Sequence, residues 1–375
     1  MLKDEYLITD APLKALTIFA LPIILGSFFQ QIYNMADSII VGQFVGSSAL
    51  AAIGACAALT NVFICAALGA GVGAGVLVSR YFGAREYGKM KTIVSTSLLS
   101  FVILSVILGA FGYFFSYSMM RILQTPADIM HDAVLYLRIY FVGFPFLFMY
   151  NILSTMFTSI GESKIPLTLL IFSSILNIFM DLWMVAGLGL GVFGAALATL
   201  IAQGISAVCC LIYIVKRFPI LHLERKDFEI CWDSFGRLLK LGIPMGLQFS
   251  ITAIGTIIVQ SAVNIYGPVH MAGFSAAGKI QNIFATVFTA FGATIATYVG
   301  QNRGAGKMDR VKQGVRYTQM MVLGWSVFVM FLMFFFGKYL TYLFVDPSEQ
   351  DVVNVSVTYF RTVFWAYTFL GSIFL

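Results

Sequence analysis

The sequence carries little charge. Only 11% of its 375 residues are Asp, Glu, Lys or Arg, whereas a soluble globular domain carries about 25%. Apolar residues make up 59% of the chain. They come in runs of about 20 or more, the length that crosses a hydrocarbon core as a helix. These features exclude a soluble domain and predict an all-α integral membrane protein.

Patterns for metal binding, disulfides and catalysis are also missing. The five cysteines form no CxxC pair, and the three histidines do not cluster. Neither GxSxG nor HExxH occurs, and Phe179 and Met180 precede Asp181 where a membrane aspartyl protease has GxGD. The sequence therefore predicts no enzymatic activity and no cofactor.

Most of the 23 Lys and Arg residues lie in alternate connections between the apolar runs, notably 80–91, 216–240 and 303–316. By the positive-inside rule, this asymmetry places the N-terminus in the cytoplasm of a multi-pass protein of the cell membrane. The net charge of +6 does not indicate nucleic-acid binding. Such binding needs clustered basic and aromatic side chains on one solvated face.

We expect about ten transmembrane helices in this chain. The first follows a charged leader that shows no small-residue cleavage pattern, so it is expected to stay in the membrane. The expected spans are 15–40, 48–75, 92–115, 132–156, 165–187, 192–215, 238–265, 270–298, 315–337 and 354–375.

The chain repeats itself at an offset of 221 to 223 residues, which indicates an internal duplication. Matching pairs run in order along the chain, among them Pro22 and Pro244, Asn61 and Asn282, Gly71 and Gly292, Pro126 and Pro347, and Tyr136 and Tyr359. Each copy has six spans. Because this number is even, both copies enter the membrane from the same side, so they are parallel and pseudo-symmetric about the membrane normal.

The repeat divides the chain into an N-terminal lobe at 1–217, a cytoplasmic linker at 218–237 and a C-terminal lobe at 238–375. Paired lobes are a common transporter plan with alternating access between them, although channels and flippases are also duplicated. An equal second copy would extend about 65 residues beyond Leu375. We therefore expect the second lobe to lack two helices and the chain to be a truncated product.

Only two acids, Asp37 and Asp181, lie in the interior of these spans. A carboxylate at the centre of a membrane helix costs about 2.5 to 3.5 kcal/mol, so it needs a partner, a proton or a cation. Position 259, which matches Asp37 in the repeat, is valine. The acids therefore indicate a function that is confined to the first half.

Asp37, Asp181 and Thr199 are expected at one level, about 9 to 12 Å below the outer surface at 1.5 Å per residue. Asn177 lies four residues before Asp181 and shares its helix face. This set of oxygens suits a hard cation such as Na⁺, or a shared proton. The alternative is that these groups form interhelical hydrogen bonds.

Other polar residues of the spans either line a cavity or join helices. They are Gln30, Tyr33, Asn34, Gln203 and Gln248. Lys279 lies inside a span without an acid to neutralise it, so we expect it to reach a water-filled cavity. Pro22 removes a backbone hydrogen bond in the first helix and is a predicted hinge.

Seven stretches of the chain resemble the multidrug and toxic compound extrusion (MATE) family. They are ALPIILGSFFQQIYNMADSIIVGQFVG, ALAAIG, VSRYFGARE, GESKIP, NIFMD, GAALAT and VGQNRGAGK. The resemblance covers essentially the whole chain, and its specificity lies in the order and spacing of the stretches.

The resemblance implies a two-lobed, twelve-helix exporter, here without its last two helices. Such a secondary active transporter expels small amphipathic, often cationic compounds in exchange for inward H⁺ or Na⁺. In the branch called DinF-like, the cation or proton site maps onto Asp37, Asn177, Asp181 and Thr199, and helix 1 bends at Pro22. We expect the protein to act as a monomer.

Two alternatives remain open. Relatives of this architecture move lipid-linked precursors across the bilayer, but such flippases have a strongly cationic cavity, and Lys279 alone supplies little charge. A truncated chain could also be a membrane protein that does not transport.

Overall fold

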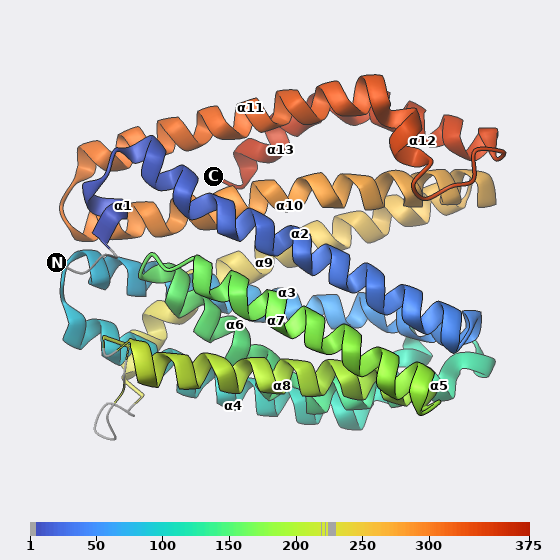
Figure 1. Ribbon diagram of the computed structural model, residues 1–375, viewed down its shortest axis with the longest axis horizontal. Coiled ribbons are helices and arrows are strands. Elements are labelled where there is room, and N and C mark those ends of the chain that lie inside the picture. Colours follow the sequence, from blue (N-terminus) through green and yellow to red (C-terminus); the bar gives the residue numbers. More distant parts are fainter. Residues whose placement is uncertain (1–4, 219, 222, 224–229) are drawn as a thin grey trace. The chain divides into compact units, whose positions relative to one another are not determined.

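The computed structural model describes residues 5–218, 220–221, 223 and 230–375, and these residues form helices and connections without any strand. This result confirms the predicted all-α class. The elements are α1 (Tyr6–Thr9), α2 (Pro12–Phe44), α3 (Ser47–Gly83), α4 (Tyr87–Ile122), α5 (Ala127–Val142), α6 (Phe144–Ser159), α7 (Lys164–Asp181), the π-helix η2 (Leu182–Gly187), α8 (Gly191–Arg217), α9 (Trp232–Asn264), α10 (Pro268–Gly304), α11 (Met308–Thr341), α12 (Gln350–Val363), the 3₁₀-helix η4 (Phe364–Ala366) and α13 (Tyr367–Ile373) (Figure 1).

Seven of these helical segments are long and apolar enough to cross a membrane, and there are eight if the bent pair α5 and α6 counts as one span. Ten spans were expected, so this count of the described residues is lower. The expected spans 238–265 and 354–375 fall on α9 and on α12 to α13, which are not among the seven. Helix α12 carries Asp351, Asn354 and Arg361, which lower its hydropathy.

The expected span 132–156 is two helices that meet at an angle of 49°. Helix α5 ends at Val142, and Pro145 stands in the first turn of α6. Proline has no N–H, so it cannot donate to the Phe141 carbonyl, and its ring opposes a straight helix. The bend therefore follows from one residue that the expected span overlooked.

The described chain forms two compact units. One comprises residues 1–28 and 251–375, and the other comprises residues 29–250. The chain passes from one unit to the other inside α2 and again inside α9, at positions 222 residues apart, which is the offset of the sequence repeat. The division into lobes at residues 217 and 238 stays a prediction. Their linker lies partly outside the described residues.

The core of the unit 29–250 contains a column of aromatic rings. The Phe141 ring lies 5.0 Å from that of Phe63 and 4.8 Å from that of Phe144, which in turn lies 5.6 Å from Phe148. Gly112 of α4 allows this packing, because a Cβ there would lie 2.3 Å from the Phe141 ring. The column ties α3, α4, α5 and α6 together.

The unit of residues 1–28 and 251–375 holds the start of the chain by hydrogen bonds. Arg310 donates to the carbonyl oxygens of Leu7 at 3.2 Å and Asp10 at 2.6 Å, and to Asn302 Oδ1 at 3.0 Å. The Asn302 amide also donates to Leu7 O at 3.0 Å. Leu7 is fully buried. These contacts fasten α1 to the junction of α10 and α11.

The substitution Arg310→Gln is expected to loosen residues 6–10. Hydrogen bonds from a charged donor are worth about 1.5–3 kcal/mol each, and glutamine cannot replace all three. Hydrogen exchange measured by mass spectrometry should show faster exchange in the peptide that covers α1. Arg303→Gln removes an exposed charge from the same junction and should leave exchange unchanged. Equal protection in both variants would contradict this role for Arg310.

Candidate cation site

A buried and a half-buried acid lie close together in the unit 29–250. Asp181 ends α7 and is fully buried, and Asp37 lies on α2 with its Oδ1 atom buried. Their carboxyl groups lie close enough for their charges to act on each other. The two acids are 144 positions apart in the sequence, so only the packing of α2 against α7 brings them together.

Asn177 lies one helical turn before Asp181 on α7, and Thr199 of α8 contacts Asn177. Both side chains are buried, and the Asn177 Nδ2 atom donates to Thr199 Oγ1 at 3.4 Å. This hydrogen bond uses the amide nitrogen and leaves the amide oxygen, Oδ1, without a donor. The bond also ties α7 to α8, which is the structural role that the sequence left open.

Four buried oxygen atoms of the site have no hydrogen-bond donor among the described residues. They are Asp37 Oδ1, Asn177 Oδ1, Asp181 Oδ1 and Asp181 Oδ2. An ionised carboxylate only accepts hydrogen bonds, and burying it unpaired is costly. These oxygens therefore need a positive charge to compensate the buried carboxylates.

Two positive charges fit this set of oxygens. A hard monovalent cation such as Na⁺ would be held by carboxylate and amide oxygens, with the Thr199 hydroxyl beside them. A single proton shared by Asp37 and Asp181 would instead convert two acceptors into an O–H···O hydrogen bond. Among the described residues, no group of three His, Cys, Asp or Glu side chains converges on a metal position.

The helix changes its geometry directly after Asp181. Residues Leu182–Gly187 form a π-helix, and the Leu188 N–H donates to the Trp183 carbonyl five residues earlier at 2.9 Å. Single π-helical turns inside α-helices often occur at functional sites, because they redirect the side chains that flank them. The predicted span 165–187 did not anticipate this π-helical turn.

A small polar cavity of about 80 Å³ adjoins the site. The predicted residues Gln30, Tyr33 and Gln203 line it together with Asn177 and Thr199. Further polar lining residues, which sequence reasoning did not single out, are Tyr150, Asn151, Ser173, Ser174 and Ser206. Asn151 was the available signal, since it places an amide in the middle of an expected span.

Two tyrosines of α5 also belong to this region. The Tyr136 and Tyr140 rings are stacked with centroids 6.2 Å apart, and Tyr136 lies close enough to Asp37 to interact with its charge. Tyr33 of α2 interacts with the charges of both acids. The repeat pairs Tyr136 with Tyr359, but the sequence did not connect either residue with the acids.

The remaining predicted residues do not line this cavity. Asn34 is exposed, Gln248 is half-buried on α9, and Pro22 is buried inside a continuous α2. Lys279 belongs to the other compact unit, where its ammonium group lies 5.9 Å from the centroid of the Phe344 ring. The water-filled cavity expected around Lys279 and the hinge at Pro22 remain predictions.

The chain resembles known proteins over nearly its whole length. The family description MatE matches residues 22–183 and 244–375. "Probable multidrug resistance protein YpnP" of Bacillus subtilis is 31% identical over 363 residues, which cover 96% of this chain and 80% of the relative. The "Multidrug export protein MepA" of Staphylococcus aureus is 25% identical, over 95% of this chain and 79% of the relative.

A solved structure shares the fold. It is described as the outward-facing conformation of a multidrug resistance MATE family transporter of the MOP superfamily. The TM-score is 0.91 at 23% identity, and the match covers 98% of this chain and 81% of the other. At this identity, the likeness concerns the fold alone.

Proposed function

Because this chain belongs to the MatE family of membrane transporters, we propose that it exports small amphipathic, cationic organic compounds in exchange for inward H⁺ or Na⁺. Family membership confirms the prediction that the chain is a transporter and not an enzyme. The names of the relatives, a multidrug resistance protein and a multidrug export protein, support organic compounds as the substrate class.

The observation that carries the coupling mechanism is the group of buried oxygens around Asp37 and Asp181, which have no donor among the described residues. Such a group holds a proton or a cation more strongly when water is excluded, because the carboxylates repel each other and have no other compensation. Binding one positive charge here offsets one of the two carboxylate charges and relieves their repulsion, and releasing it restores that repulsion. The site can therefore make the protein respond to an ion gradient.

The polar cavity beside the acids connects ion binding to substrate transport in this proposal. Asn177 and Thr199 belong to both the site and the cavity lining. A change in the charge of the acids therefore reaches the cavity through two shared side chains. Alternating access, with the N-terminus in the cytoplasm of a cell-membrane monomer, completes the proposal.

Efflux from vesicles tests the proposed function. The 375-residue chain is reconstituted into liposomes loaded with a fluorescent lipophilic cation, and a Na⁺ gradient or an H⁺ gradient is imposed in separate runs. Efflux is expected to accelerate with at least one gradient and to return to the rate of protein-free liposomes when an ionophore collapses it. Efflux that responds to neither gradient would refute coupled export.

A further inference from the structure

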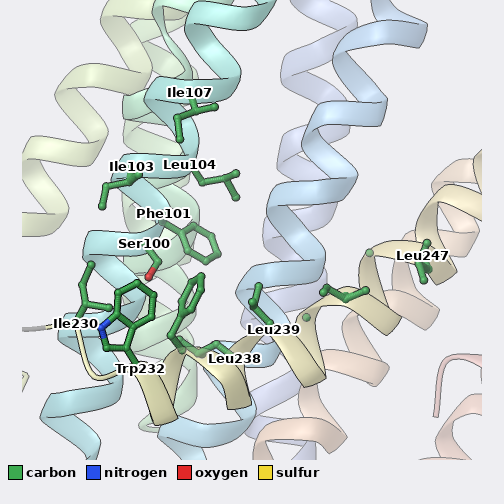
Figure 2. A pocket seen from close by; sticks show the side chains of 14 residues that line it. Ser100, Phe101, Ile103, Leu104, Ile107, Ile230, Trp232, Leu238, Leu239 and Leu247 are labelled. Atoms are coloured by element: carbon green, nitrogen blue, oxygen red, sulfur yellow. The ribbon is translucent and has the colours of Figure 1, made fainter.

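Helices α4 and α9 border an apolar pocket of about 640 Å³ in the unit 29–250 (Figure 2). Ser100 is its one lining residue with a polar side chain beyond the Trp232 indole N–H. The other lining residues are apolar side chains and glycines, among them Ile107, Phe235, Leu239, Gly242, Ile243 and Gly246. Its volume falls in the range of about 300–1,000 Å³ found for ligand sites.

Two glycines of α9 that line the pocket, Gly242 and Gly246, lie against glycines of α3. A Cβ on Gly69 would lie 2.5 Å from the backbone of Gly246, and one on Gly73 would lie 2.9 Å from the nitrogen of Gly242. Such close approach of two backbones fixes the crossing of the helices. Figure 2 shows Ser100, Ile103 and Ile107 along one helix and Leu239 and Leu247 on another that runs obliquely away from it.

The first turns of α9 are amphipathic. Trp232, Phe235 and Leu239 line the pocket at helical spacing, whereas Asp233, Arg237 and Lys240 follow one another on a different face. Arg237 donates to Tyr81 Oη at 3.0 Å and pairs with Asp233 at 2.7 Å, and Lys240 is exposed. Trp232 is 77% exposed. Exposed tryptophans of membrane proteins typically lie at the membrane interface.

Several pocket walls are open to the outside. Ile107 is 58% exposed and Ile243 is 55% exposed, so an acyl chain can enter the pocket from outside the protein. The lining contains no carboxylate, and the nearby Asp233 is already paired with Arg237. The pocket therefore disfavours a cationic compound, while the exposed Lys240 beside it favours an anion.

We propose that this pocket holds an acyl chain of an anionic phospholipid, with the lipid phosphate beside Lys240. Basic edges between membrane helices attract acidic lipid headgroups on the side that the charge asymmetry predicts to be cytoplasmic. The Ser100 Oγ atom has no hydrogen-bond partner among the described residues and faces the same space as Trp232 (Figure 2). It is suited to donate to an ester carbonyl of the lipid. This inference does not depend on the proposed export.

Native mass spectrometry of the full 375-residue chain tests the proposal. The protein in detergent is mixed with phosphatidylglycerol or with phosphatidylcholine of the same acyl chains, and the retained lipid is counted. Ile107→Trp fills the pocket, and Val106→Trp adds the same ring to an exposed position of α4 outside it. Lys240→Gln removes the headgroup charge, and Lys164→Gln removes an exposed charge elsewhere in the unit.

The wild-type chain is expected to retain phosphatidylglycerol in preference to phosphatidylcholine by about fivefold or more, the effect of one Lys at an anionic surface. Ile107→Trp should lose both lipids, and Lys240→Gln should keep binding but lose the preference, while both control variants behave as wild type. Equal retention by Ile107→Trp and Val106→Trp would overturn the site. An unchanged preference in Lys240→Gln would overturn its headgroup specificity.

Discussion

Replacing Asp181 with asparagine is expected to reduce gradient-driven efflux to the rate of protein-free liposomes. Asparagine has the shape of the acid, but it can neither carry the negative charge that holds a cation nor exchange a proton. Asp181 is fully buried, and neither of its oxygens has a donor among the described residues, so no neighbour substitutes for the lost charge. Asp37→Asn should have the same effect, since the two carboxyl groups act on each other.

Both site variants are expected to lose gradient-driven efflux while they keep the fold. Removing an uncompensated buried charge relieves desolvation and repulsion, so the midpoint of thermal unfolding should stay the same or rise. Asp128→Asn, in the exposed first turn of α5, is the matched control and should transport as wild type. Full gradient-driven efflux by either site variant would remove the acids from the coupling mechanism. Loss of efflux together with a lower midpoint would instead indicate a structural role.

Of the substitutions proposed for this protein, Gly69→Ala is expected to lower the stability of the fold most. Its added Cβ would lie 2.5 Å from Gly246 Cα and N, and backbone atoms cannot rotate out of the way as a side chain can. Overpacking of this kind typically costs about 1–3 kcal/mol, and leucine at the same position should cost more. The measurement is the midpoint of thermal unfolding in detergent.

Gly54 provides the control on the same helix, because a Cβ there would meet nothing within 4 Å. Gly54→Ala should therefore unfold at the wild-type midpoint, or slightly above it because alanine favours the helix. Equal midpoints of thermal unfolding for Gly69→Ala and Gly54→Ala would contradict the close crossing of α3 and α9.

The sequence alone identified the acids of the candidate site, because a carboxylate inside an apolar span is conspicuous whatever surrounds it. It also grouped Asn177 with Asp181, since helical spacing puts them on one face. It did not indicate Tyr136, Tyr150 or Asn151. Their importance arises from helices α5 and α6 packing beside the acids, and hydropathy contains no information about which helices are neighbours.

The membrane class, the duplication and the two intramembrane acids are local or periodic properties of the chain, and the amino-acid sequence by itself determined them. The tertiary structure decided which distant segments meet. It brought Asp37 to Asp181, placed the unit boundaries inside α2 and α9, and opened the pocket between α4 and α9. The physical reason is that these features depend on side-chain volume and close backbone approach between helices far apart in the sequence, as at Gly69 and Gly246.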